Sequence, residues 1–174
     1  MKKTLLISLI VAAFCSFYAS GNNFSTNEGG ISDVAPTFEK GDLVLNFGIG
    51  VGRSPRGTTQ LPPLTFSVEY GLVNDLFTEN LNLGIGGIFG FQTYTWFGDT
   101  YTTFSFGARA TVHYPLVDDF DVHSGIMMGF RTNPGRMMGG VYIGGRYYFT
   151  DNIAVMAELG YGITYLNVGM AFKF

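Results

Sequence analysis

The last ten residues, 165–174, alternate between apolar side chains and side chains that are mostly small or polar. One face carries Leu166, Val168, Met170, Phe172 and Phe174. This two-residue period predicts a β-strand. A soluble protein seldom ends on such a strand, because termini fray and exposed apolar edges aggregate. In a barrel embedded in lipid, the same strand closes the sheet and its apolar face meets acyl chains.

The composition agrees with a domain whose exterior contacts lipid. Charged residues make up 13% of the chain, about half the usual share, whereas aromatic residues reach 16% and glycine occupies 25 positions. A water-soluble domain of this length needs more charged residues to cover its surface.

The first 21 residues predict a secretory signal peptide. Lys2 and Lys3 form its basic region, residues 5–14 its apolar stretch, and residues 19–21 a small-residue cleavage site. The apolar stretch is too short for a membrane anchor. Cys15, the only cysteine, lies inside this segment, so we expect the mature chain to lack disulfides and cysteine metal sites.

Two further regions follow the signal peptide. Residues 22–39 are polar and are expected to form a flexible lead-in, and residues 40–174 a single outer-membrane β-barrel domain. Removing Lys2 and Lys3 from the 10 basic residues leaves 8 against 13 acidic ones. This balance argues against nucleic acid as a partner.

Seven earlier segments share the period of the last one and are separated by turn residues. They span residues 42–52, 64–72, 81–93, 103–114, 121–131, 140–149 and 152–161. Their connections alternate between longer segments (52–63, 92–102 and 131–139) and mostly shorter turns. This pattern predicts an all-β fold, an eight-stranded antiparallel up-and-down transmembrane β-barrel with both ends in the periplasm.

The rival interpretation is a soluble lipocalin-like barrel with its apolar face inside. The polar face separates the two. It consists mostly of Gly, Ser, Thr and Asn with isolated charges, whereas a water-facing surface would be rich in Lys and Glu. Such a face suits the crowded lumen of a narrow barrel. Aromatic residues gather near the strand ends. This is the placement expected at the two interfaces of a bilayer, where aromatic side chains are enriched.

The runs from Phe38 to Gly50, from Gly144 to Gly160 and from Leu166 to Phe174 resemble the small outer-membrane β-barrel (porin-like, OmpA/OmpX-type) proteins of the Bacteroidetes. The resemblance covers the mature chain and specifies the architecture better than the activity. It implies an outer-membrane location after export, and a terminal strand that the barrel assembly machinery recognises. That strand would present Leu166, Val168, Met170, Phe172 and Phe174.

Charges inside a barrel are costly unless they are paired. Arg146 and Glu158 lie on neighbouring predicted strands within side-chain reach, and Arg109 and Glu69 can complete a polar network in the lumen. Asp42 and Lys173 predict a second pair at the periplasmic mouth. The network serves either as a structural plug or as a gate whose partner exchange opens a narrow ion path. Side chains just fill an eight-stranded interior, which favours the plug.

The two histidines, His113 and His123, fall on the inward face near the periplasmic mouth. His123 and Ser124 are adjacent and point to opposite faces, so they cannot form the dyad of a lipid A deacylase. No third ligand for a metal is evident beside the histidines. We therefore predict no catalytic residues, no metal and no cofactor.

The sequence favours a structural or surface-interaction role through external loops. Their side chains would contact lipopolysaccharide, outer-membrane lipid or an unidentified surface ligand, through Arg53, Arg56, Trp96, Asp99, Arg131 and Arg136. The alternatives are a narrow, low-conductance channel for ions or small solutes and, from another class, a lipid A-modifying enzyme.

Overall fold

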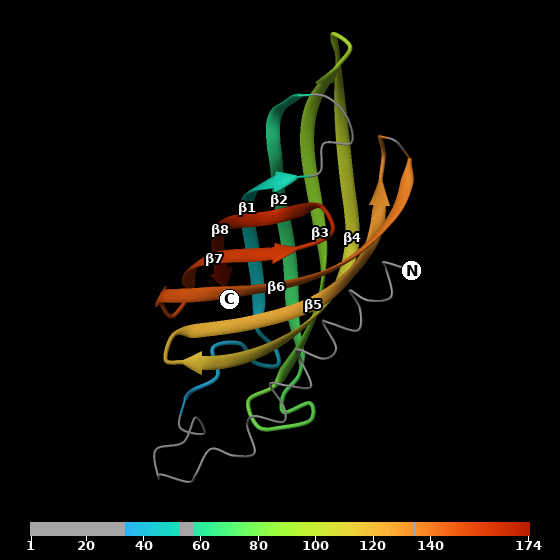
Figure 1. The fold of residues 1–174 in the computed structure, drawn as a ribbon. Helices are drawn as coiled ribbons and strands as arrows, with labels where there is room; N and C mark the ends of the chain where they lie inside the picture. The colour runs from blue at the N-terminus through green and yellow to red at the C-terminus, as the bar shows by residue number, and fades with distance from the viewer. Residues whose placement is uncertain (1–33, 53–57, 134) are drawn as a thin grey trace, which may run out of the picture. The chain divides into compact units, whose positions relative to one another are not determined.

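A computed structural model describes residues 34–52, 58–133 and 135–174. The unit that begins at Val34 is a closed barrel in which every strand pairs antiparallel with its neighbours in chain order (Figure 1). Its strands are β1 (Leu43–Gly52), β2 (Thr58–Val73), β3 (Asn82–Trp96), β4 (Asp99–Val117), β5 (Phe120–Arg131), β6 (Arg136–Thr150), β7 (Ile153–Gly160) and β8 (Thr164–Lys173). The predicted eight-stranded antiparallel architecture is confirmed. The predicted signal peptide lies outside the described residues.

Within the described ranges, no helix has the length and apolar character needed to cross a membrane.

The barrel closes where the first and last strands pair, as the terminal alternation predicted. β1 and β8 run in register from Val44 opposite Lys173 to Val51 opposite Leu166. Phe174 continues this ladder, because it exchanges both backbone hydrogen bonds with Leu43, at N···O distances of 2.9 and 3.1 Å. We call the end that carries these residues the terminal end and the opposite end the far end.

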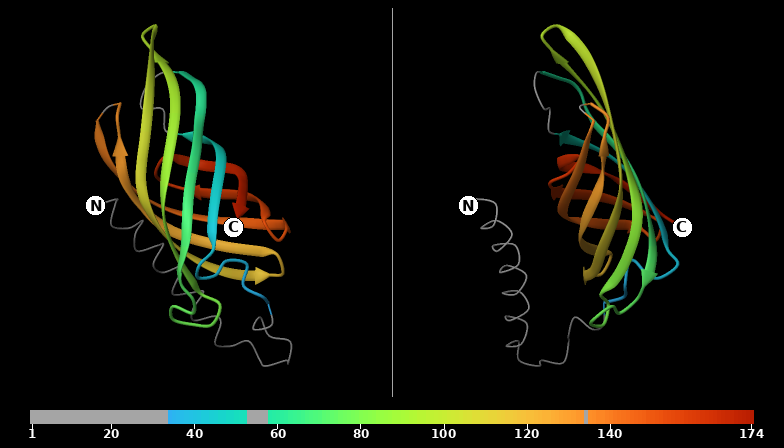
Figure 2. Two further views of the ribbon diagram at one scale, coloured as in Figure 1. Left: turned by 180° about the vertical axis from the view of Figure 1, so that it is seen from behind. Right: turned by 90° about the vertical axis from the view of Figure 1, so that its right-hand side faces the viewer.

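Several strands extend further toward the far end than the sequence pattern predicted. The expected loops 92–102 and 131–139 are mostly strand, and the β3–β4 hairpin projects beyond the neighbouring strands (Figures 1 and 2). Its turn consists of Phe97 and Gly98, with φ of 51° and 89°, as a two-residue hairpin turn requires. The alternating threonines and aromatics on both arms favour strands. Tyr94 stacks on Tyr101 across the hairpin, with ring centroids 5.6 Å apart.

The two faces of the sheet have the predicted polarity, which is inverted relative to a water-soluble barrel: apolar side chains lie outside and polar ones inside. Phe106 and Met128 are 51% and 68% exposed on the outside. Buried polar side chains fill the inside at Asn46, Thr65, Ser67, Glu69, Asn82, Gln92, Thr103, Ser105, Arg109, Thr111, His113, Asp121, His123, Arg146, Glu158 and Asn167. This arrangement is the opposite of a lipocalin-like barrel.

Inward glycines make room for the larger lumen side chains. A Cβ at Gly144 would lie 2.7 Å from His123 Nε2 and 2.8 Å from Glu158 Cγ. A Cβ at Gly125 would lie 2.5 Å from the Tyr142 hydroxyl. Part of the high glycine content therefore follows from the narrow interior.

Candidate functional site in the barrel lumen

Seven charged or titratable side chains from five strands meet in the lumen, and each is no more than 7% exposed. We call this group the lumen network. It consists of Glu69 on β2, Arg109 and His113 on β4, Asp121 and His123 on β5, Arg146 on β6 and Glu158 on β7.

One half of the network links β2, β4, β5 and β6. Arg146 donates through Nη2 to Glu69 Oε2. The other oxygen of Glu69 lies 3.1 Å from His113 Nε2. His113 Nδ1 in turn lies 2.8 Å from Asp121 Oδ2. Glu69 thus holds a guanidinium with one oxygen and an imidazole with the other.

The other half begins at Glu158. Its Oε1 accepts from Arg109 Nη2 at 2.7 Å and lies 3.2 Å from His123 Nε2. His123 Nδ1 approaches Asp121 Oδ2 to 3.6 Å, and Arg146 Nη1 approaches the same oxygen to 3.7 Å. Asp121 therefore joins the two halves into one network.

The sheet register explains the central part of this arrangement. His113 and His123 are direct cross-strand partners on β4 and β5, and Asp121 opposes Arg146 on β5 and β6. Glu69 on β2 and Glu158 on β7 reach the histidines across the lumen. β3 separates β2 from β4, and β6 separates β7 from β5. Only a narrow, closed barrel brings these side chains together.

The charges of the network nearly balance. Three carboxylates face two guanidiniums, and each guanidinium contacts at least one carboxylate. Burying unpaired charges costs far more than burying paired ones. One negative charge is left to be compensated at the histidines, which lie between the carboxylates.

Toward the far end, a second layer covers the network. The Arg109 guanidinium carbon lies 4.0 Å from the centroid of the Tyr142 ring, and the Tyr142 hydroxyl is 2.6 Å from Thr111 Oγ1. Ile163, from the connection before β8, is 4% exposed. A pocket of about 20 Å³ remains here, lined by Arg109, Tyr142, Glu158 and Ile163 among others. That volume holds about one water molecule.

Toward the terminal end, an apolar cluster fills the mouth. It consists of Phe38, Val44, Tyr148, Ala154 and Ala171, all buried. Phe38 stacks on His113 with ring centroids 4.0 Å apart, and its carbonyl accepts from Asn82 Nδ2. Phe38 belongs to the predicted lead-in, of which only residues 34–39 are described, so the flexibility of that segment stays a prediction.

The four predicted members of the lumen network do come together, with different partners from those expected. Arg146 pairs with Glu69, and Glu158 pairs with Arg109. The neighbouring-strand pair of Arg146 and Glu158 is absent from the ion pairs of the described residues. Each side chain instead extends across the lumen to a carboxylate or guanidinium on a more distant strand.

The structure does not bring Asp42 and Lys173 together, and no ion pair joins these two described residues. Asp42 Oδ2 accepts from the Glu39 backbone N–H at 2.9 Å. Lys173 Nζ donates to the Thr37 carbonyl at 3.1 Å and lies 5.2 Å from the centroid of the Tyr148 ring. Both side chains thus anchor the segment that precedes β1.

Sequence reasoning overlooked Asp121 and the central place of the histidines. Asp121 shares the parity of His123 on β5, which was sufficient to place it inside. Ligand atoms of His113, Asp121 and His123 lie within 4.8 Å of one another. The absence of a third ligand was the ground for predicting no metal, and Asp121 removes that ground.

Catalytic geometry of the serine–histidine kind does not form among the described residues. No hydroxyl group there donates a hydrogen bond to either imidazole. His123 is buried in the lumen, whereas Ser124 is its neighbour on the opposite face of β5. Both ring nitrogens of each histidine face carboxylates instead.

The predicted external loop residues lie mostly at strand ends. Trp96 ends β3, Asp99 begins β4, Arg131 ends β5 and Arg136 begins β6. Arg131 Nη2 donates to the Gly162 carbonyl at 3.4 Å, which ties the β7–β8 connection to β5. Arg53 and Arg56 lie outside the described residues.

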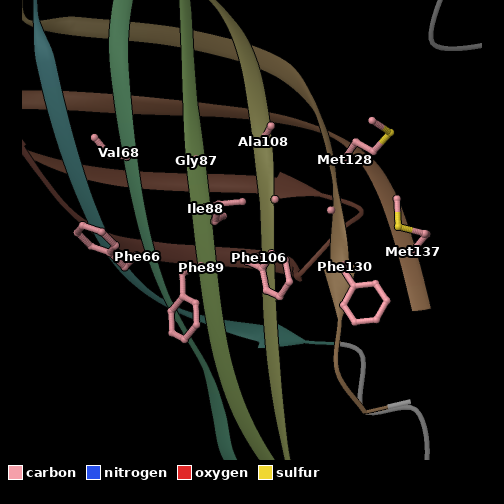
Figure 3. Close-up of a pocket in the computed structure, with 12 residues that line it drawn as sticks. Phe66, Val68, Gly87, Ile88, Phe89, Phe106, Ala108, Met128, Phe130 and Met137 are labelled. Atoms are coloured by element: carbon pink, nitrogen blue, oxygen red, sulfur yellow. The ribbon is translucent and has the colours of Figure 1, made fainter. Parts of the chain in front are cut away.

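A shallow apolar groove of about 600 Å³ lies on the outer surface over β2 to β6. Small residues, Gly87 and Ala108, form part of its floor, and a row of four rings borders it (Figure 3). The rings belong to Phe66, Phe89, Phe106 and Phe130, which are consecutive cross-strand partners.

No protein-family model matches the chain, and no curated protein matches it. Among solved structures, the chain is similar to a de novo designed transmembrane β-barrel. The TM-score is 0.59 at 15% identity, over 79% of this chain and 98% of the designed one. The attachment invasion locus protein Ail of Yersinia pestis is similar at a TM-score of 0.47 and 11% identity, over 78% of this chain and 99% of Ail. The first likeness shows that the fold is that of a transmembrane β-barrel. The resemblance to a Bacteroidetes family stays a prediction.

Proposed function

We propose that this protein is an integral outer-membrane β-barrel with a closed lumen, and that it acts through its far end rather than by transport or catalysis. The observation that carries the proposal is the inverted polarity of the sheet. Apolar side chains cover the outside, and the buried interior is polar and charged.

The apolar exterior of the barrel suits a lipid environment. In water, a continuous band of exposed Phe, Leu, Ile, Val and Met would cost roughly 25 cal/mol for each Å² of apolar surface. Against acyl chains that cost vanishes, and the closed sheet satisfies every backbone group that faces the hydrocarbon. The likeness to a designed transmembrane barrel supports the same environment.

The closed lumen is proposed because three layers obstruct the path along the barrel axis. Phe38 and its apolar cluster fill the terminal end, the lumen network crosses the middle, and Ile163 and Tyr142 cover it from the far end. A pocket with room for about one water does not provide a continuous hydrated path.

A role at the far end is proposed because exposed aromatic and arginine side chains project there. The β3–β4 hairpin carries Trp96, Tyr94 and Tyr101, and its turn residue Phe97 is 89% exposed. Arg136 is exposed at the start of β6. Aromatic and arginine side chains are enriched at binding surfaces, and arginine is suited to phosphate. Lipopolysaccharide phosphates or a surface ligand are the proposed partners, together with outer-membrane lipid and the barrel assembly machinery.

Two measurements on the full chain folded in detergent test this proposal. Unheated protein should migrate differently from heated protein on a gel, and it should aggregate when detergent is removed without lipid. In planar bilayers it should give no steady conductance. Single-channel steps abolished by Glu158→Ala would instead establish the narrow channel. An altered lipid A profile on expression would establish a lipid-modifying enzyme.

A further inference from the structure

We propose that His113, Asp121 and His123 form a binding site for one divalent transition metal ion of the Zn²⁺ class. Two imidazole nitrogens and a carboxylate oxygen converge within 4.8 Å of one another. All three residues are no more than 1% exposed. This donor set is one that Zn²⁺, Co²⁺ and Cu²⁺ accept.

Each ring has a carboxylate at Nε2, on the side away from the proposed metal ion. Glu69 Oε1 faces His113 Nε2 at 3.1 Å, and Glu158 Oε1 faces His123 Nε2 at 3.2 Å. When the carboxylate at Nε2 holds the proton of a neutral ring, a lone pair is left on Nδ1. Pairs of this kind are the usual outer partners of metal-bound histidines.

Both Nδ1 atoms then point at the same carboxylate. His113 Nδ1 and His123 Nδ1 lie 2.8 and 3.6 Å from Asp121 Oδ2. With neutral rings held in that tautomer, three lone pairs face one another, which is repulsive unless a cation lies among them. Ligand atoms bound to tetrahedral Zn²⁺ at about 2.0–2.1 Å are separated by about 3.3 Å, and the two observed separations lie on either side of that value.

Two atoms of this cluster have no hydrogen-bond partner among the described residues, namely His123 Nδ1 and Asp121 Oδ1. A proton on His113 Nδ1 satisfies the shorter contact to Asp121 and leaves both of these atoms unpaired. A metal ion bound by the two Nδ1 atoms and Asp121 Oδ2 engages His123 Nδ1 as well, so that Asp121 Oδ1 is the one atom of this pair left without a partner. Buried polar atoms without partners are rare and costly, so the metal explains more of the geometry.

The charge around the cluster tolerates a divalent cation. Three carboxylates and two guanidiniums leave one negative charge when the histidines are neutral, and a divalent ion changes this to one positive charge. Arg146 opposes the ion, because its Nη1 lies 3.7 Å from Asp121 Oδ2. Glu69 binds the same guanidinium through Nη2 and offsets that repulsion. The competing occupant is one proton shared by the histidines.

The site is closed toward the terminal end by Phe38, whose ring stacks on His113. A metal ion entering from that end must displace this ring. Phe38→Ala should therefore speed metal association and dissociation more than it changes the equilibrium affinity. That kinetic effect distinguishes the buried site from adventitious binding at surface carboxylates.

The test is a Co²⁺ titration of the full chain, folded in detergent micelles and freed of metal with a chelator. We expect visible d–d absorption bands that saturate at one equivalent and disappear when Zn²⁺ is added. Cu²⁺ in the same protein should show electron paramagnetic resonance couplings to two imidazole nitrogens. Heat-modifiable gel mobility establishes that each sample is folded.

Variants separate ligands from outer partners. His123→Gln should abolish the one-equivalent signal, and Glu158→Gln should weaken binding roughly 10–100-fold, as expected of an outer partner. Gln92→Ala is the control, because Gln92 is buried in the lumen and its Nε2 has no hydrogen-bond partner among the described residues. If folded wild-type protein gives no saturable signal, a proton alone occupies the cluster and the proposal is wrong. Signals unchanged in His123→Gln would equally overturn it. Neither result affects the proposed closed barrel.

Discussion

Arg109 on β4 and Glu158 on β7 meet at 2.7 Å although two strands separate them in the sheet. The contact crosses the lumen, so it forms only when the barrel has closed. Both side chains are buried, and each has further partners, Tyr142 for the guanidinium and His123 for the carboxylate. This pair therefore reports on the interior of the closed barrel more directly than any backbone contact does.

Removing one member of this pair should destabilise the barrel strongly. Arg109→Met leaves Glu158 buried beside His123 with its main counter-charge gone, at a cost of about 3–5 kcal/mol. Urea unfolding of the protein in lipid vesicles measures the change. The double variant Arg109→Met with Glu158→Met should recover much of the loss, because neither charge remains buried alone. If the loss in the double variant equals the sum of the losses in the two single variants, the two side chains are not coupled.

Phe38 should stabilise the barrel although it precedes the first strand. Phe38→Ala removes a buried ring from the apolar cluster and from His113, so the free energy of unfolding should fall by about 3 kcal/mol. Phe97→Ala is the matched control, since that ring is 89% exposed in a turn. A similar, small effect of both substitutions would mean that the segment before β1 does not fill the mouth.

Gly144 should not tolerate a side chain. The added methyl group of Gly144→Ala would press on the Ala157 carbonyl, His123 and Glu158, and a loss of about 1–3 kcal/mol is expected. Gly139→Ala, on the same strand, is the control, because the nearest atom to its Cβ is 3.7 Å away. Unfolding in vesicles should separate the two variants. Equal stabilities would indicate that the lumen has more space than this packing allows.

Phe174 should matter more for assembly than for the finished barrel. Its backbone pairs with Leu43, which alanine preserves, and its side chain is 71% exposed. We expect Phe174→Ala to lower the amount of folded protein in outer membranes while its unfolding free energy in vesicles changes little. Met137→Ala, also strongly exposed on the outer face, is the control. Accumulation of Phe174→Ala at wild-type levels would contradict the assembly role.

Three features of the fold were predictable: the strand order, the closing pair of β1 and β8 and the inverted polarity. Each follows from the two-residue period, which can be seen directly in the sequence. The far ends of β3 and β4 were not, although Thr93, Tyr94, Thr95 and Trp96 continue that period. Their polar threonines resembled loop residues, and the turn at Phe97 and Gly98 places a bulky residue at a positive φ.

Four of the seven members of the lumen network were predicted, but their pairing was not. Parity places Glu69, Arg109, Arg146 and Glu158 inside, but their partners depend on how strands far apart in the sheet face each other after closure. Local reasoning favours contacts between adjacent strands. Asp121 was missed although its parity matches that of His123. The position of Phe38 in the mouth of the barrel was not predicted, because the alternating pattern of the strands does not indicate a side chain that enters the lumen from the segment before β1.

The most direct test of the account is a nuclear Overhauser measurement between lipid acyl chains and the side chains of β4 in the unmodified barrel, reconstituted in bicelles. Phe104, Phe106 and Ala108 should show cross-peaks to acyl protons, and Thr103, Ser105 and Thr111 should show none. This alternation is what an apolar exterior and a polar closed lumen require. Water contacts at Phe104 and Phe106, with acyl contacts at neither, would contradict the account and favour a water-soluble barrel.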